Sequence, residues 1–278
     1  MDKVIIFGKG YLGTRISEEF GYTLIGRSEV DLLDFHLLEE FLEREKPDVV
    51  INTAGQTGRP NVDWCESHKE DTVLSNVNVA SNLSILCAKK EIYFVHIGSG
   101  CIYEGTNNDL GYSEKDEPNF YGPQFYAKTK ILAEMILREF PGLIVRVRLP
   151  IDDRPHERNL INKVNKYSKV LNVKNSITTV PHMLPALKSL IEQRKQGIVN
   201  IVNPGLISPL EIMEMYKKIV DPSHEFSEMS VEELNQITDA KRSNCFLTTT
   251  ELNSLGVELP EIHKAIEECL LKYKEALK

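Results

Sequence analysis

The sequence lacks the cysteine patterns by which disulfide-rich and zinc-binding proteins are recognised. Its 278 residues include five cysteines, an odd number, and none of them stands in a Cys-x-x-Cys pair. Such spacing offers neither a disulfide framework nor a zinc site, so we predict no metal and a reducing location, the cytoplasm. The five are Cys65, Cys87, Cys101, Cys245 and Cys269.

Long runs of one residue class are also missing. The 33 basic and 41 acidic residues give a formal net charge of −8, and basic residues neither cluster nor alternate with aromatic ones. We therefore predict no nucleic-acid partner. The apolar run at residues 4–7 leads straight into glycines and is too short for a signal peptide or a membrane span, so we predict no membrane association.

What the sequence does contain is an alternation of strand and helix patterns up to Pro150. This alternation is typical of an α/β fold of the Rossmann type, a doubly wound parallel sheet. Beyond Pro150 the pattern becomes irregular, which favours a smaller C-terminal lobe. Strands are expected at 3–7, 22–25, 47–52, 93–97, 143–149 and 197–202, and helices at 14–20, 35–45, 70–90, 126–140, 160–167, 185–194, 209–220 and 260–277.

A glycine motif follows the first expected strand. Gly8, Gly10 and Gly13 have the spacing Gly-x-Gly-x-x-Gly. These glycines permit a tight turn and let the N–H groups of the next helix face a pyrophosphate, although a turn without a ligand is the alternative. We predict that 1–150 is an NADP-binding domain and 151–278 mainly a substrate lobe, some of whose segments pack back on the first domain. The predicted pyrophosphate contacts are Gly8, Gly10, Tyr11, Leu12 and Gly13.

The end of the second strand bears on the choice of cofactor. Folds that select NAD usually place an acid there, whereas this chain has Gly26-Arg27-Ser28. A cation and a hydroxyl suit a 2′-phosphate, so we predict NADPH over NADH, with Arg27 as its ligand. Asp31 is predicted to reach the adenine, or else to join Asp34 in capping the next helix.

A turn of small residues, Thr53-Ala54-Gly55, follows the third expected strand. We predict that Ala54 and Gly55 lie against the cofactor. Asn76 falls on the long helix expected at 70–90. It either braces the backbone near the active site or is an ordinary buried amide.

Tyr126 and Lys130 lie four residues apart on an expected amphipathic helix and therefore share one face. A lysine cation held near a phenol favours the phenolate and lowers the pKa of the phenol. We predict that Tyr126 protonates a carbonyl oxygen and that Lys130 also holds the nicotinamide ribose. Ser99 follows a buried strand and is predicted to hydrogen-bond the substrate carbonyl. Alone, Tyr-x-x-x-Lys also fits an ordinary helix.

The glycine motif, Ser99 and Tyr126-x-x-x-Lys130, in this order, resemble those of an extended short-chain dehydrogenase/reductase. Further segments resemble signatures of the plant-type bifunctional nucleotide-4-keto-6-deoxyglucose 3,5-epimerase/4-reductases. More distantly, the chain is similar to bacterial dTDP-4-dehydrorhamnose reductase and GDP-fucose synthase. The segments are 61–69, 100–104, 115–120, 146–151, 203–205 and 242–244.

The resemblance implies an NADPH-dependent enzyme that inverts C3 and C5 of a UDP- or dTDP-4-keto-6-deoxyglucose and reduces C4, giving nucleotide-β-L-rhamnose. It implies that Cys101 and Lys163 are the acid and base of epimerisation, in an order left open; packing alone is the alternative for Cys101. It also implies a set of substrate contacts, namely Tyr103, Glu104, Asn159, Arg242 and Asn244.

Two other functions stay open at this point. One is a 4-reductase that needs a separate epimerase. The other is a non-catalytic binding subunit, because the regulatory subunit of methionine adenosyltransferase looks like the same reductase family. The sequence also leaves open UDP against dTDP, and whether the chain forms a homodimer.

Overall fold

The computed structural model describes residues 2–122 and 124–278. Its chain forms two compact units, each assembled from separate stretches of sequence. The first contains Met1–Ile102, Tyr121–Val145 and Leu190–Ile198, and the second contains Tyr103–Phe120, Arg146–Ser189 and Val199–Lys278. The chain thus leaves the first unit after Ile102 and again after Val145, and residues 121–145 and 190–198 return to it.

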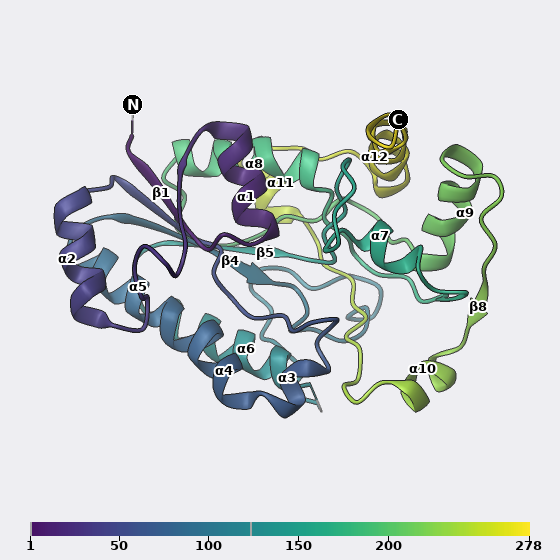
Figure 1. Ribbon diagram of the computed structural model, residues 1–278, viewed down its shortest axis with the longest axis horizontal. Helices are drawn as coiled ribbons and strands as arrows, with labels where there is room; N and C mark the ends of the chain where they lie inside the picture. Colours follow the sequence, from purple (N-terminus) through teal and green to yellow (C-terminus); the bar gives the residue numbers. More distant parts are fainter. Residues whose placement is uncertain (1, 123) are drawn as a thin grey trace. The chain divides into compact units, whose positions relative to one another are not determined.

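The larger sheet confirms the predicted fold class (Figure 1). Its strand order is β2-β1-β3-β4-β5-β7. β1 pairs in parallel with β2 and β3, and β3 pairs in parallel with β4. Parallel strands end at the same edge, so the turns that follow β1, β3 and β4 lie close together. The strands are β1 Val4–Phe7, β2 Thr23–Ile25, β3 Val49–Asn52, β4 Tyr93–Ser99, β5 Leu143–Val147 and β7 Gly197–Asn200.

Several helices differ from expectation, among them the first helix and the long helix expected at 70–90. The first helix begins at Tyr11, three residues before the predicted start, so Gly13 lies inside it. The helix expected at 70–90 contains a turn of π-helix, η1. The helices are α1 Tyr11–Phe20, α2 Phe35–Glu45, α3 Trp64–Ser67, α4 Lys69–Val73, η1 Leu74–Asn78, α5 Val79–Lys89, α6 Phe125–Leu137 and α8 Val180–Glu192.

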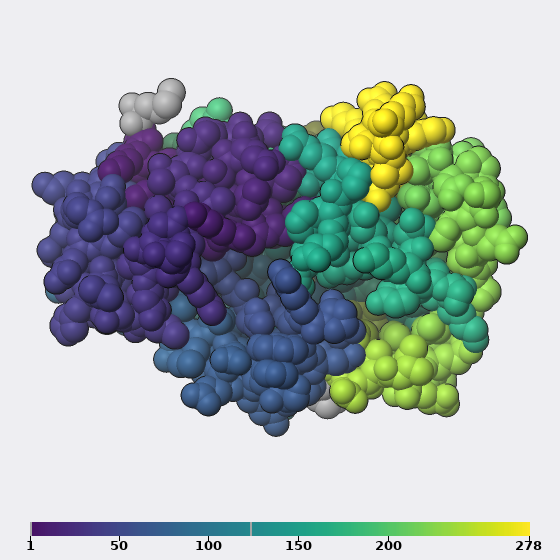
Figure 2. All heavy atoms as spheres, in the orientation of Figure 1, coloured from purple at the N-terminus to yellow at the C-terminus, as the bar shows by residue number. Residues whose placement is uncertain are grey.

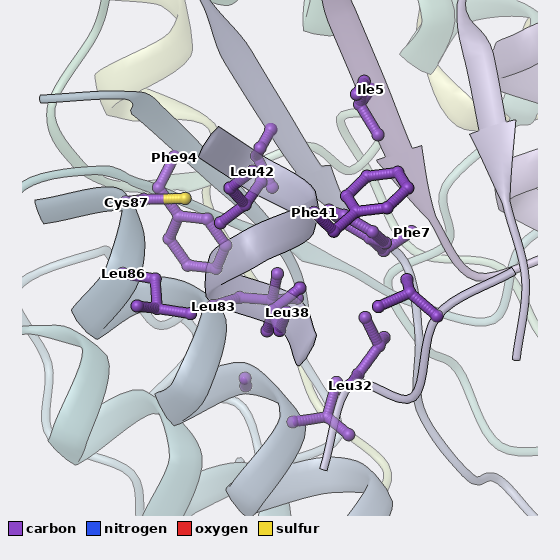
Figure 3. Close-up of a cluster of buried hydrophobic side chains, with 14 of the residues drawn as sticks. Ile5, Phe7, Leu32, Leu38, Phe41, Leu42, Leu83, Leu86, Cys87 and Phe94 are labelled. Carbon is purple, nitrogen blue, oxygen red and sulfur yellow. The ribbon is translucent and has the colours of Figure 1, made fainter. Parts of the chain in front are cut away.

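One face of the larger sheet is covered by α2 and α5, and α1 lies on the opposite side (Figure 1). Figure 3 shows the apolar side chains of β1 and β4 meeting those of the two helices in a closely packed cluster. In the space-filling view the purple and blue atoms of this part of the chain lie packed against one another (Figure 2). The close packing of these apolar side chains holds the strands in place, and with them the residues at the carboxyl ends of the strands. The cluster includes Ile5, Phe7, Leu38, Phe41, Leu42, Leu83, Leu86 and Phe94.

The second unit has its own core, in which α9 packs against α12. Ser208 caps α9, and Met213 on this helix is fully buried in the core. A small parallel sheet of β6 and β8 was not predicted. The elements are β6 Lys169–Leu171, β8 Ser227–Met229, α7 Leu160–Val164, α9 Pro209–Ile219, α10 Val231–Ile237, α11 Thr250–Ser254 and α12 Ile262–Ala276. Over residues 2–122 and 124–278, no helix has the length and apolar character to cross a bilayer.

Candidate active site

The glycine turn after β1 is packed tightly against the turn that follows β3. Gly8 has a φ of +113°, and a Cβ there would lie 2.6 Å from the backbone nitrogen of Ala54. A Cβ on Gly13 would collide with the carbonyl oxygen of Gly8 and lie 2.5 Å from Oγ1 of Thr53. Packing therefore requires both glycines. At Gly10, by contrast, a Cβ would meet no atom of the described residues within 4 Å.

The start of α1 fits the pyrophosphate of a dinucleotide. Gly10 is the N-cap residue, in an extended conformation, and no side chain caps the helix. The first turn of a helix is a typical binding site for an anion, and here Tyr11, Leu12 and Gly13 form that turn beside the open space at Gly10. Contact of these residues with a cofactor stays a prediction.

Beyond β2, three hydrogen-bond donors surround one carboxylate. Glu29 accepts from the Gly26 N–H at 3.0 Å and the Ser28 hydroxyl at 2.8 Å, and it forms an ion pair with Lys9. The hydrogen bond from Lys9, followed by that from Ser28, lowers the pKa of Glu29 to about 2. The Lys9 side chain passes over Gly26, where a Cβ would come within 2.9 Å of Lys9 Cδ. Sequence reasoning assigned no role to Lys9 or Glu29.

Arg27 is exposed and donates from Nη2 to the Ser75 hydroxyl on η1 at 3.1 Å. Asp34 caps α2 by accepting from the N–H groups of His36 and Leu37, which confirms the capping interpretation for this residue. Asp31 accepts from the Leu33 N–H at 2.9 Å. The contact of Asp31 with adenine is untested.

The turn after β3 is tied to two other elements. Asn52 Oδ1 accepts from the Ala54 N–H at 2.9 Å. Asn76 accepts from the Gln56 N–H at 2.7 Å and donates to the Gln56 carbonyl and the Thr129 hydroxyl, both at 3.0 Å. Asn76 thus holds the backbone at Gln56, and it is also a buried, fully hydrogen-bonded amide, so both interpretations of this residue fit the structure. A π-turn, the geometry of η1, is frequent at functional sites.

The structure brings Ser99, Cys101, Tyr126 and Lys130 together in the first unit. Ser99 ends β4, and its Oγ accepts from the Cys101 N–H at 3.1 Å and hydrogen-bonds the phenol of Tyr126. Tyr126 and Lys130 stand on α6 with exposed fractions of 9% and 7%. The Cys101 thiol is close enough for its charge to act on both.

The pKa of Tyr126 is raised from its ordinary value, so the prediction that Lys130 lowers it is wrong here. Burial is the main cause, the Cys101 charge adds to it, and the hydrogen bond with Ser99 opposes it. Burial also lowers the pKa of Lys130 to about 8, against the charges of Glu134 and Cys101. Tyr126 is therefore a neutral phenol, and hence a proton donor, at neutral pH.

In the second unit, Tyr103 serves the packing of the chain. Its side chain is fully buried, with the hydroxyl donating to the Asp116 carbonyl at 2.5 Å. The ring stacks on Tyr112 at 4.5 Å and lies 5.2 Å from the Arg146 guanidinium. Glu104, by contrast, is half-buried, with 40% of its side chain exposed, and pairs with Lys241 at 2.6 Å. Of these two predicted contacts, only Glu104 presents its side chain at the surface.

Asn159 is also internal, which argues against the predicted contact with substrate. It is fully buried at the start of α7. Its Oδ1 accepts from the N–H groups of Asp152 and Ile161, and its Nδ2 donates to the carbonyls of Asp152 and Arg154. These four hydrogen bonds use the whole capacity of an amide side chain.

Buried Arg148 holds the segment that contains Arg242 and Asn244. Arg148 donates to the Ser243 hydroxyl at 3.2 Å, to the Ser243 carbonyl at 2.6 Å and to Asn175 Oδ1. Asn175 in turn donates to Asn244 Oδ1 at 2.9 Å. Arg242 is half-buried and donates to the Ala240 carbonyl at 2.7 Å. The sequence signature contained Arg148 but gave no reason to assign it this role.

The segments that contain Glu104 and Asn244 run side by side. The Gly105 N–H donates to the Asn244 carbonyl at 2.8 Å, and Gly105 bridges Cys245 in parallel. The Ser243 hydroxyl also donates to the Tyr103 carbonyl, 140 positions away in the sequence. The structure thus joins two of the predicted substrate segments.

Lys163 stands on α7 in the second unit and is half-buried. Burial, followed by the charge of Arg158, lowers the pKa of Lys163, whereas Glu157 raises it. A lysine with a lowered pKa can lose and regain a proton more readily near neutrality. Its pairing with Cys101 stays a prediction, because the two residues belong to different units.

A protein-family comparison matches the RmlD substrate binding domain over residues 2–274. A bifunctional dTDP-4-dehydrorhamnose 3,5-epimerase/dTDP-4-dehydrorhamnose reductase of Arabidopsis thaliana is 37% identical, over 97% of this chain and 91% of that protein. A trifunctional UDP-glucose 4,6-dehydratase/UDP-4-keto-6-deoxy-D-glucose 3,5-epimerase/UDP-4-keto-L-rhamnose-reductase of the same plant is 38% identical over 98% of this chain. The chain spans 41% of the length of that trifunctional relative.

Solved structures agree with this match. The L780 UDP-rhamnose synthase of Acanthamoeba polyphaga mimivirus is 31% identical with a TM-score of 0.91, covering 98% of this chain and 99% of that one. The fold is also shared with dTDP-4-dehydrorhamnose reductase of Bacillus anthracis, solved in complex with NADP, at 19% identity and a TM-score of 0.84, covering 98% and 99% of the two chains. The predicted family resemblance is confirmed.

Replacing Arg148 with Met should loosen the 242–245 segment. The change removes the buried donor of the Ser243 carbonyl and one of the two donors of Asn175 Oδ1, which keeps the hydrogen bond from the Cys245 N–H, at a cost of about 2–4 kcal/mol. Hydrogen exchange should show faster exchange of the Gly105 amide, whose bond is to Asn244. Arg44→Met, at an arginine with a 66% exposed side chain, is the control and should change little. Unchanged protection of Gly105 in Arg148→Met would contradict the role of Arg148.

Proposed function

The chain belongs to the RmlD substrate binding domain family, and from this premise we propose that it converts a nucleotide-4-keto-6-deoxyglucose to nucleotide-β-L-rhamnose with NADPH. The supporting observation is the buried group of Ser99, Tyr126 and Lys130, which stands at the carboxyl end of β4 in the sheet that carries the glycine turn after β1. Relatives named for rhamnose synthesis, one of them matched in structure over nearly its whole length, support the substrate class.

NADPH supplies the hydride for reduction at C4, and the chain provides its binding groups. The N–H groups at the start of α1 hold the pyrophosphate beside Gly10, where the structure leaves room for it. Arg27, Lys9 and Ser28 hold the 2′-phosphate; Glu29 now accepts hydrogen bonds from two of these three. The NADP and NADPH bound in solved structures of the same fold agree with this choice.

In reduction, Tyr126 gives its proton to the C4 oxygen. A phenol can do so only when it is protonated, and burial keeps Tyr126 in that form. Ser99, which hydrogen-bonds Tyr126, also donates a hydrogen bond to the substrate oxygen and so aligns it. Lys130 holds the nicotinamide ribose and restores the proton that Tyr126 has lost. Glu104, Arg242 and Asn244 in the second unit bind the nucleotide-sugar.

Epimerisation at C3 and C5 is the further part of the proposal. The protons at these carbons flank the C4 ketone, so that removal of either one gives an enolate that the ketone stabilises. Cys101 and Lys163 take the two roles, one removing the proton and the other returning it on the opposite face. The lowered pKa of Lys163 supports its part, and the 37% identical bifunctional relative supports the combination.

A reductase without epimerase activity is the second candidate. It is favoured by the fold shared with the reductase of Bacillus anthracis. Incubation of the pure protein with the unepimerised keto sugar and NADPH separates the two. A bifunctional enzyme makes the rhamnose derivative unaided, whereas a simple reductase makes it only after an epimerase has been added.

Replacing Tyr126 with Phe should lower kcat for reduction by about 10²–10⁴-fold, because the proton donor is lost. Binding of NADP⁺, followed by calorimetry, should stay within about twofold because the ring remains in place. Tyr121→Phe, at a tyrosine with 61% exposure, is the matched control and should keep full activity. Turnover by Tyr126→Phe near the wild-type rate would refute the role of Tyr126.

Replacing Cys101 with Ser should abolish exchange of the C3 and C5 protons with solvent deuterium, a loss of about 10²-fold or more. Reduction of the substrate that has already been epimerised should persist, and this serves as the internal control. Lys163→Met should lose exchange in the same way. Mass spectrometry of the recovered sugar measures both effects. Exchange retained in either variant removes that residue from the epimerisation step.

Replacing Arg27 with Asp should weaken NADPH binding by about tenfold or more and shift selectivity toward NADH. The loss of a cation and the gain of a like charge both act against the 2′-phosphate. Fluorescence titration with each cofactor measures the ratio of the two dissociation constants. Arg44→Asp carries the same change of charge on α2 and is the control. An unchanged ratio in Arg27→Asp would overturn the assignment of the 2′-phosphate ligand.

A further inference from the structure

A buried polar pair lies next to Lys130 and is not used in the mechanism above. Asn52 and His96 are cross-strand neighbours in the register of β3 and β4. Their exposed fractions are 0% and 2%. Asn52 Nδ2 lies 3.0 Å from His96 Nδ1, and His96 Nε2 lies 3.4 Å from Lys130 Nζ. An amide, an imidazole and an amine thus form one chain of contacts that runs from β3 to α6.

The hydrogen bonds of Asn52 determine which nitrogen of His96 carries the proton. The Ala54 N–H can only donate, so the atom of Asn52 that it contacts at 2.9 Å is the oxygen Oδ1. The other terminal atom is therefore Nδ2, which can only donate, and His96 Nδ1 must accept from it. Burial, and secondarily the charge of Lys130, lowers the pKa of His96 well below its usual value, so the ring is neutral. A neutral ring that accepts at Nδ1 carries its proton on Nε2.

His96 therefore presents an N–H group to Lys130 Nζ. Toward an ammonium this is a contact between two donors, whereas toward a neutral amine it is a weak N–H···N hydrogen bond. Lys130 Nζ also lies 3.5 Å from the Ile97 carbonyl oxygen, a distant acceptor. The N–H group of His96 hence favours loss of a proton from Lys130, in addition to the effect of burial.

We propose that Asn52 fixes His96 as the Nε2–H tautomer, and that His96 is a positioning residue which, by offering Lys130 a donor instead of an acceptor, keeps its amine able to release a proton near neutral pH. This inference rests on the proposed function, in which Lys130 restores the proton that Tyr126 has lost. Each cycle then breaks an N–H bond of Lys130 and forms the O–H bond of Tyr126, and solvent returns the proton to Lys130.

Other charged and titratable groups also face Lys130. Glu134, one turn along α6, raises the pKa of Lys130 and is itself paired with Arg138 at 2.7 Å. Cys101, in the turn after β4, acts in the same direction. Tyr126 lies on the same helix and is neutral. Neither Glu134 nor Cys101 is altered in the variants below, so their effects remain constant throughout the comparison.

The first measurement is the tautomer of His96 in the wild-type protein. Long-range proton–nitrogen NMR distinguishes a protonated ring nitrogen from a bare one, and the His96→Asn variant assigns the signals. We expect Nε2 protonated, Nδ1 bare, and no change between pH 5 and 8. A ring protonated at Nδ1, or at both nitrogens, overturns the inference at once, with no variant needed.

The second measurement is the titration of Lys130, followed by the carbon resonance next to Nζ and assigned with Lys130→Met. In Asn52→Asp, one carboxylate oxygen still accepts from Ala54 and the other accepts from Nδ1–H. The tautomer then reverses, and a lone pair on Nε2 faces Lys130. We expect Lys130 to hold its proton about tenfold more tightly, a rise of ~1 pKa unit.

The added carboxylate charge also favours the ammonium, so the His96→Asn background is the matched control. Asn52→Asp in that background retains the charge but has no imidazole to reverse. We expect most of the rise to disappear there. An equal rise in both backgrounds overturns the inference. If Asn52→Asp does not fold, as judged by circular dichroism, the tautomer measurement decides alone.

Activity separates this inference from the proposed function. Absence of turnover by the wild-type protein on any nucleotide-4-keto sugar defeats the proposed function, and the NMR titrations still decide the tautomer. Where turnover occurs, the limb of the kcat/KM profile near pH 8 should move upward in Asn52→Asp together with the Lys130 titration. A profile that stays in place while the titration moves overturns the role of His96 in proton supply.

Discussion

The chemistry of the first unit depends on the burial of one amine, that of Lys130. Removing an ammonium group from water is costly unless a counter-charge and hydrogen bonds compensate. Here the compensation is partial: Glu134 acts at a distance through its charge, and the nearest groups are an imidazole N–H and a carbonyl at 3.4 and 3.5 Å. The amine is consequently held with a pKa of about 8, close enough to neutrality for it to exchange protons.

This constraint also explains the state of Tyr126. A phenol beside a permanently charged lysine would be drawn toward the phenolate, which cannot protonate an alkoxide. In the structure, burial and the neighbouring Cys101 outweigh any such effect and keep the phenol protonated. A neutral acid next to a lysine that readily loses its proton forms a short route for proton supply. The correction to the predicted pKa thus makes the proposed mechanism simpler.

The sequence could predict the site residues whose arrangement depends on near neighbours in the chain, but not those that meet only through the fold. Tyr126 and Lys130 were predictable since a helix places positions four apart on one face. Ser99 was predictable because it ends a buried strand. His96 and Asn52 were not, because their contact joins strands 44 positions apart and depends on sheet register. Lys9 and Glu29, 20 positions apart, meet only through the packing of Lys9 over Gly26.

The fold, too, was predictable from local sequence patterns and not where it depends on distant contacts. The α/β alternation was correct, but α8 begins at Val180 although the sequence favoured a start at Pro185. A proline near a helix start is a good signal, and Pro181 fits that position better. The pairing of β6 with β8 joins residues 58 positions apart in three-residue strands, too short for any periodicity to predict.

The substrate segments of the second unit depend on buried arginine in the way that the first unit depends on buried lysine. Arg148 is 1% exposed, and its described hydrogen bonds go to Ser243 and Asn175. A guanidinium cannot lose its proton at any ordinary pH, so it can serve as a fixed support. Lysine is chosen where a proton has to move, and arginine where geometry has to be kept. The predicted contacts Arg242 and Asn244 flank Ser243, the residue that Arg148 holds, so their positions depend on the hydrogen bonds of this buried guanidinium.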